Sequence, residues 1–257
     1  MQIFLCEDSV DGIFTGVYDA WASGLGHNNV RLLAGDEESI RQTELFCEYR
    51  VIRPDPDKAE KVLRTVKNKI SILSARMLVS ACCSERKDKA EAVYRFIVLG
   101  LKLGRRTPDR LTNPYVLAVF EMNRQVGNEV HHYLGFLRFS KVYRNILFAE
   151  FEPKSDIAAL VAPHFADRLP GENFVICDRR RKKAAVHPAQ SPWYMTEVTD
   201  ELLYQMEKEA GKEEDYPNLW KAFFESIAIE ERRNERLQNT LLPKRFRSMM
   251  TEFQVSE

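Results

Sequence analysis

Short apolar runs and one amphipathic segment alternate over the first 57 residues. The run Gln2–Cys6 is almost wholly apolar and predicts a buried strand. Between residues 13 and 21 apolar positions recur three and four apart, which predicts a helix with Ser9 as N-cap and Gly24 as its stop. Residues 44–52 alternate apolar and polar positions like a half-buried strand. The opening is therefore predicted to be strand, helix, strand.

The pattern then changes to helices. Apolar residues three and four apart predict helices over residues 57–70, 71–83 and 88–104, and a further helix that starts at Pro114 and runs to about His132.

Elements of both kinds follow in the second half. The pattern predicts an antiparallel strand pair (132–140 and 145–153), a helix capped by Ser155 and kinked or divided at Pro163 (155–169), a hairpin (173–178 and 182–188) and two last helices (198–217 and 218–229). The expected fold class is α+β, with helices packed around a modest, mainly antiparallel sheet. We expect a single domain over residues 1–257, with an internal seam near residues 105–114.

Composition excludes several classes of protein. With 257 residues, 44% of them hydrophobic, the chain is long enough to bury a sizeable core. No window approaches the 18 or so apolar residues of a membrane span, and the acidic N-terminal stretch is not a secretory signal, so a cytoplasmic protein is expected. The five cysteines form no CxxC pair, which favours reduced thiols over disulfides or a zinc ribbon. No cofactor or metal is predicted.

Basic residues are concentrated in two places, although the formal net charge is zero. Residues 58–110 hold 14 basic and 5 acidic residues, which is typical of a solvated helical face and compatible with a surface for polyanions. The densest run is Asp178–Lys183, with the five consecutive cations Arg179, Arg180, Arg181, Lys182 and Lys183. Such a run could bind phosphates or form a solvated turn.

Two groups of residues have side chains suited to catalysis. Glu129 and His131 lie in the segment EVHH, where Glu129 and His132 form a single ExxH pair. Because di-iron bundles need two such motifs, a polar cluster or an acid–base or phosphate role is favoured over a metal site. His164 and Arg168 lie four residues apart, so one helical face could present both to an anion or pair them locally.

Charges are dense near the C-terminal end. Acidic and basic residues nearly cancel over 230–236, whereas Lys244, Arg245 and Arg247 have no acidic neighbour within about four residues. The residues preceding this run, 218–229, have the spacing of an amphipathic helix. Phosphate loops, nucleophile elbows and zinc-protease helices have no match in the sequence.

Four segments resemble an uncharacterised bacterial family of probable DNA metabolism proteins, and the similarity extends over nearly the whole chain. They are FLCEDSVDGIFTGVYDAW, EVHHYLGFLRF, APHFADR and LWKAFFESIAIEERRNERLQNTLLPKRFR. Members of that family are often fused to a uracil-DNA glycosylase-like domain and encoded beside a radical SAM partner protein, and this chain resembles the stand-alone form. It departs from the family at Phe246 and Arg247, where many members have Tyr-Trp, and at Ala228 and Ile229, where Asn-Pro is common.

The resemblance implies a nucleic-acid-binding accessory protein that presents DNA to a radical SAM or uracil-DNA glycosylase-like partner. Its predicted contacts are Arg179, Arg180, Arg181, Lys182, Lys183, Lys244, Arg245 and Arg247. An alternative hypothesis is an enzyme acting on a nucleotide or nucleobase, with Glu129, His131, His164 and Arg168 in one pocket. A third is an interaction scaffold for the radical SAM partner that does not bind DNA.

Overall fold

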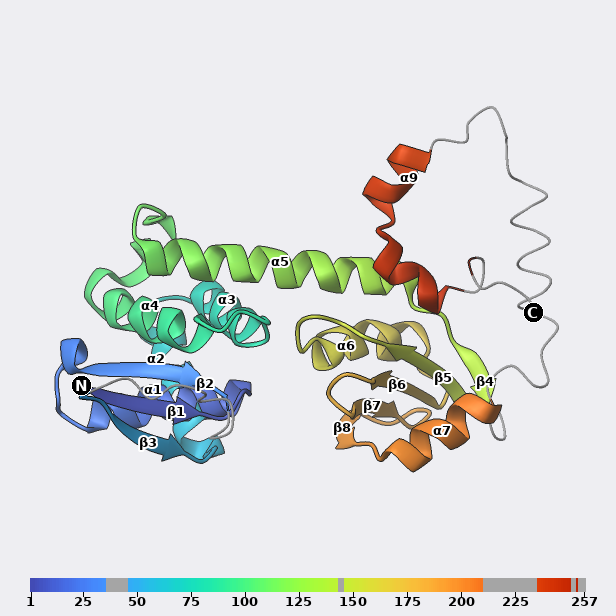
Figure 1. Cartoon of the computed structure of the whole chain (residues 1–257), viewed down its shortest axis with the longest axis horizontal. Helices are drawn as coiled ribbons and strands as arrows, with labels where there is room; N and C mark the ends of the chain where they lie inside the picture. Colours follow the sequence, from blue (N-terminus) through green and yellow to red (C-terminus); the bar gives the residue numbers. More distant parts are fainter. Residues whose placement is uncertain (36–45, 143–145, 210–234, 251–252, 254–257) are drawn as a thin grey trace. The chain divides into compact units, whose positions relative to one another are not determined.

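The computed structural model describes residues 1–35, 46–142, 146–209, 235–250 and 253, and its fold class is α+β, as predicted. The chain packs into two compact units, Met1–Asn128 and Glu129–Glu257, each with its own sheet (Figure 1). The division therefore falls after the seam predicted near residues 105–114. The number of independently folding domains stays a prediction.

The first unit combines a small parallel sheet with a group of helices (Figure 1). Its elements are β1 (Gln2–Cys6), α1 (Val10–Ala22), the 3-10 turn η1 (His27–Asn29), β2 (Val30–Ala34), β3 (Glu48–Ile52), α2 (Pro56–Lys69), α3 (Ile72–Cys82), α4 (Lys89–Leu103) and the 3-10 turn η3 (Gly104–Asp109). The helix α5 (Pro114–Phe136) has residues in both units.

Strand β1 is the centre of the first sheet, whose order is β2-β1-β3 with both pairings parallel. Gln2 pairs with Val30 on one side and Glu48 on the other. A parallel neighbour requires a crossover connection, and α1 supplies it between β1 and β2. Ser9 caps α1 as predicted by accepting the N–H of Gly12 at 3.0 Å.

Helix α1 approaches β1 so closely that a side chain at Gly16 would collide with the strand. A Cβ built at Gly16 would lie 2.0 Å from the Sγ of Cys6, which is fully buried. We expect Gly16→Ala to lower the free energy of unfolding by about 1–3 kcal/mol, because overpacking outweighs the gain in helix propensity. Denaturant unfolding followed by circular dichroism measures this difference.

Two matched variants test the cause of that loss. Cys6→Ala removes the colliding sulfur and leaves the nearest atoms at 3.5 Å, so the double variant should be more stable than Gly16→Ala alone. Gly127→Ala adds a Cβ to a helical glycine with nothing within 4 Å, so it should leave stability unchanged or raise it by up to about 1 kcal/mol. Equal effects of Gly16→Ala and Gly127→Ala would contradict the close approach.

The second unit holds a five-stranded mixed sheet in the order β4-β5-β6-β7-β8 (Figure 1). Its described elements are β4 (Ser140–Val142), β5 (Ile146–Phe151), α6 (Ala158–Arg168), β6 (Phe174–Asp178), β7 (Lys183–His187), β8 (Tyr194–Glu197), α7 (Asp200–Glu209), α9 (Glu235–Leu241) and the 3-10 turn η5 (Lys244–Met249). Helix α6 packs against β6 and β7.

The expectation of mainly antiparallel strands fits only in part. In the second sheet β5 and β6 are parallel, while the other three pairings are antiparallel. The crossover helix α6 between β5 and β6 is the reason, since it returns the chain to the edge where β5 began. Together with the parallel first sheet, this makes the strand pairing more evenly divided than predicted.

Several elements follow the predicted pattern and others correct it. Strand β1, helices α1 to α4 and the β6–β7 hairpin are confirmed. The strand expected over 132–140 is wrong at its start, because α5 continues to Phe136. Pro163 does not divide α6. The second strand begins at Glu48, and the helix predicted at 218–229 lies outside the described residues.

Two strands, β2 and β8, were not predicted from the sequence. Strand β2 is a run of five residues beside a turn, too short for a period to show. Strand β8 has all four residues exposed, so it has no alternation of buried and exposed positions. Among the helices of the described residues, none combines the length and apolar character needed to cross a bilayer.

Candidate functional site

Glu129 is a buried carboxylate that holds a loop. It lies on α5 with 5% of its surface exposed, and its two oxygens accept the backbone N–H groups of Lys154 at 2.9 Å and Ser155 at 3.0 Å. The guanidinium of Arg245 lies 3.9 Å from one of these oxygens. Both oxygens are therefore engaged within the protein, and this geometry indicates a structural role.

The two adjacent histidines on α5 have different surroundings. His131 is exposed. The ring of His132 is stacked on Phe136, with centroids 5.8 Å apart, and lies 5.1 Å from the ring of Phe246. The face that carries the ExxH pair thus packs against aromatic side chains. No group of three His, Cys, Asp or Glu side chains that could hold a metal ion occurs in the part of the chain that the structure describes.

His164 and Arg168 are both exposed on α6, one helical turn apart. Within the described residues no hydrogen bond, ion pair or ring contact joins any two of Glu129, His131, His164 and Arg168. Their common catalytic role stays a prediction.

Carboxylates surround the five-cation run 179–183 at the β6–β7 turn. Arg179 lies 3.6 Å from Glu150 and 3.8 Å from Glu152. Lys182 and Lys183 lie 2.7 Å from Asp200 and 3.6 Å from Asp156, respectively, in ion pairs.

Arg181 belongs to the structure of the same turn. It bonds the fully buried Asp178 at 3.0 Å and donates to the carbonyl groups of Pro153 and Lys154. Asp178 also accepts the backbone N–H groups of Arg180 and Arg181. Burial raises the pKa of Asp178 and Arg181 opposes the rise. Five carboxylates therefore offset the five cations of this run, which leaves little local positive potential for a polyanion.

Residues 243–247, called the tail motif below, are anchored to α5 through Phe246. Phe246 is 2% exposed, and its ring lies 5.0 Å from that of Tyr133 and 5.5 Å from that of Phe136. We refer to His132, Tyr133, Phe136 and Phe246 as the aromatic cluster. Burial, followed by the charge of Glu129, raises the pKa of Tyr133 well above its ordinary value.

Two of the three tail cations, Arg245 and Arg247, contact other described residues. The guanidinium of Arg245 lies 4.6 Å from the ring centroid of Phe246, in addition to its approach to Glu129. Arg247 donates to the side chain of Asn239 at 2.8 Å and lies over the ring of Phe253. Lys244 is exposed. The tail motif thus has a packing role that its sequence alone did not indicate.

Residues 58–110 of the first unit hold many exposed cations without a counter-charge. Ten basic side chains of the 58–110 block are exposed, and none forms an ion pair or hydrogen bond through its side chain in the part of the chain described. They are Lys61, Arg64, Lys67, Lys69, Arg76, Lys87, Lys102, Arg105, Arg106 and Arg110. The excess charge of this block is visible in the sequence, whereas its lack of ion pairs is visible only in the structure.

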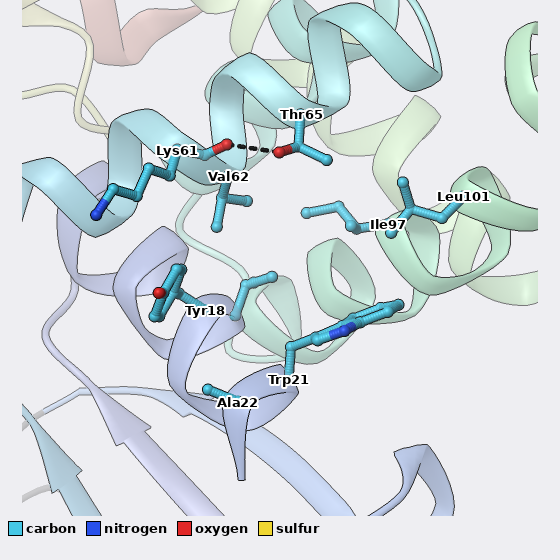
Figure 2. Close-up of a pocket in the computed structure, with 9 residues that line it drawn as sticks. Tyr18, Trp21, Ala22, Lys61, Val62, Thr65, Ile97 and Leu101 are labelled. Carbon is cyan, nitrogen blue, oxygen red and sulfur yellow. Dashed lines mark hydrogen bonds between the residues drawn. The ribbon is translucent and has the colours of Figure 1, made fainter. Parts of the chain in front are cut away.

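A cavity of about 420 Å³ opens among three helices of the first unit (Figure 2). It is lined by Val17, Tyr18, Trp21 and Ala22 from α1, Lys61, Val62 and Thr65 from α2, and Ile97 and Leu101 from α4. Ligand pockets commonly have volumes of about 300–1,000 Å³ and mostly apolar linings, so this cavity is of suitable size for a small planar group.

The tryptophan at the cavity is held on one side. The ring of His27 lies 4.6 Å from that of Trp21, and the Nδ1 of His27 is 2.8 Å from the hydroxyl of the buried Tyr94. Arg95 donates to the carbonyl of His27 at 2.6 Å and pairs with Glu91. Burial, followed by Lys102 and Arg95, lowers the pKa of His27, so its neutral form is favoured beside the indole.

A buried lysine pairs with an exposed aspartate after the carboxyl end of β1. The ammonium group of Lys89, 4% exposed, pairs with Asp8 and donates to the carbonyl of Ser84 at 2.6 Å. Burial raises the pKa of the neighbouring Cys82 thiol, which disfavours the reactive thiolate. Lys89 thus links the first residue of α4 to Asp8, which follows β1, and to the carbonyl of Ser84.

Comparison with known proteins gives a family and no activity. The model of a domain of unknown function, DUF4130, matches residues 87–252. No curated protein matches the chain. Most of the cavity lining and the α2 cations precede the matched residues.

Proposed function

This chain belongs to the DUF4130 family, and since that family has no established function, we propose from the chain's own residues that it binds nucleic acid. The observation that carries the proposal is the set of ten exposed, unpaired cations at residues 58–110 of the first unit. Binding to phosphates depends on such cations, because each contact releases a condensed counterion.

The cations of α2 supply the most compact part of this surface. Lys61, Arg64, Lys67 and Lys69 fall within nine residues of one helix, whereas the buried positions Ala59, Val62 and Val66 face the core. We call these four residues the α2 cations. Ion pairing neutralises the 179–183 run locally, so the main contact surface in this proposal is the first unit.

The DNA metabolism role and the partners implied by the family resemblance are part of the same proposal. A nucleic-acid-binding unit fits an accessory protein that delivers DNA to a radical SAM or uracil-DNA glycosylase-like protein. The residues proposed here, however, bind phosphate whichever partner takes part.

Salt-dependent binding to DNA tests the proposal. We expect the wild-type chain to bind a fluorescein-labelled oligonucleotide at about 50 mM salt, with affinity falling linearly on a log–log plot against salt concentration. Changing the α2 cations to glutamine should reduce the slope by up to about 3 for a single strand, at about 0.7 per phosphate contact. Fluorescence anisotropy measures both quantities.

A matched variant gives the comparison. Changing Arg179, Arg180, Lys182 and Lys183 to glutamine removes the same number of charges from the neutralised run, and it should change the slope by less than the α2 variant does. Absence of salt-dependent binding by the wild-type chain would overturn the proposal. A larger loss of slope from the 179–183 variant would overturn the assignment to α2.

A further inference from the structure

The cavity of the first unit has the features of a stacking site beside a phosphate-binding surface. Trp21 lines it and is 46% exposed, although it is a large aromatic residue. Lys61 lines the same cavity and is one of the α2 cations. In Figure 2 the side chains of Trp21, Val62 and Ile97 come from three helices and surround one space.

The indole of Trp21 is positioned before any ligand arrives. His27 packs against it, and His27 is in turn fixed through Tyr94 and Arg95. An aromatic ring fixed in this way loses little conformational entropy when a second flat group stacks on it. The accessible part of the indole is therefore a preformed stacking platform.

The charge at the cavity favours an anionic ligand with a flat apolar part. None of the nine lining residues is acidic, and Lys61 is the one charged residue among them. The nearby Asp19 is already paired with Lys58 at 2.8 Å. Arg64 lies one turn along α2 from Lys61, is exposed and forms no ion pair with any described residue.

We propose that this cavity takes an unpaired base of single-stranded DNA, which stacks on Trp21 while Lys61 and Arg64 contact the adjacent phosphates. The inference rests on the proposed function and adds a base-binding subsite to it. Bases of every kind have an aromatic face, so the subsite would select unpaired bases over duplex without reading the sequence. Val62, Ile97 and Leu101 would supply the apolar walls.

Loss of the indole should remove the contribution of the base and leave that of the phosphates. We expect Trp21→Ala to weaken binding of a labelled oligo-dT by about 5- to 150-fold, the range of one base–aromatic stack, with an unchanged salt slope. Trp21→Phe should retain much of the affinity. Tyr115→Ala removes an exposed aromatic residue elsewhere in the first unit and should bind like the wild type.

An abasic oligonucleotide of the same length separates the two proposals. It keeps the phosphates and lacks the bases, so the wild-type chain should bind it more weakly than oligo-dT by about the factor lost in Trp21→Ala. That variant should bind both probes equally. A wild-type chain that shows a salt slope but no preference for oligo-dT over the abasic probe overturns the inference and leaves the proposed function intact.

A fluorescence measurement tests the stacking without depending on whether the Trp21→Ala variant folds. With Trp193 and Trp220 changed to phenylalanine, Trp21 is the one tryptophan left in the chain. Its fluorescence should be quenched by oligo-dT and not by the abasic probe at matched occupancy. Equal quenching by both probes, or none by either when both bind, contradicts base stacking at this site.

Discussion

Replacing Phe246 with alanine is expected to lower the free energy of unfolding of the second unit by about 3–5 kcal/mol, the usual range for a buried phenylalanine. Its side chain is almost fully buried, and its ring packs against the other members of the aromatic cluster, with edge-to-face contact to Tyr133. Thermal unfolding followed by circular dichroism measures the loss. The same change should make trypsin cleave faster after the exposed Lys244 and Arg245, because the anchor that holds the backbone of this segment is removed.

An exposed residue of the same segment gives the control. Leu241 is 63% exposed, so Leu241→Ala should change stability by no more than about 0.5 kcal/mol and leave the tryptic pattern unchanged. If Phe246→Ala matched Leu241→Ala in both measurements, the tail would not be anchored as described.

The second large effect is expected at Glu129. Glu129→Ala should cost about 2–4 kcal/mol, because it leaves the N–H groups of Lys154 and Ser155 without their acceptor and removes the carboxylate beside Arg245. Glu129→Gln should cost less, since its amide oxygen can still accept one of the two N–H groups. Chemical denaturation compares the two variants.

Asn128 supplies the comparison for Glu129. It precedes Glu129 on α5 and is exposed, so Asn128→Ala should be neutral within about 0.5 kcal/mol. A carboxylate that served a substrate alone would give the opposite result, with Glu129→Ala as stable as Asn128→Ala. The experiment therefore discriminates between a structural glutamate and the catalytic one of the enzyme hypothesis.

The sequence predicts an element well where one face is strongly apolar. The buried run Gln2–Cys6 and the spacing around Phe14 and Val17 give β1 and α1, and the basic turn near Arg180 was expected between two strands. The apolar pattern does not identify the element where a short segment fits both the strand period and the helix period. Residues 132–136 suit an alternating strand and the last turn of a helix equally, and packing on Phe246 favours the helix.

The site could be predicted less well than the fold, because its character depends on partners distant in sequence. The carboxylates that neutralise the 179–183 run come from other segments, such as Glu150 and Asp200, and no local pattern predicts that they lie beside this turn. The cavity at Trp21 likewise needs α1, α2 and α4 together. Charge density was visible in the sequence, whereas the net local charge required the fold.

The central place of β1 has a consequence for folding kinetics. Since β2 and β3 each pair with β1 and not with each other, the first sheet forms only when Gln2 meets both Val30 and Glu48. Bringing these distant segments together costs chain entropy before the strand contacts form. The sheet should therefore form more slowly than helices, which depend on local contacts. In the folded unit the amide protons of Ile3 to Cys6 should exchange with solvent only when the whole unit opens.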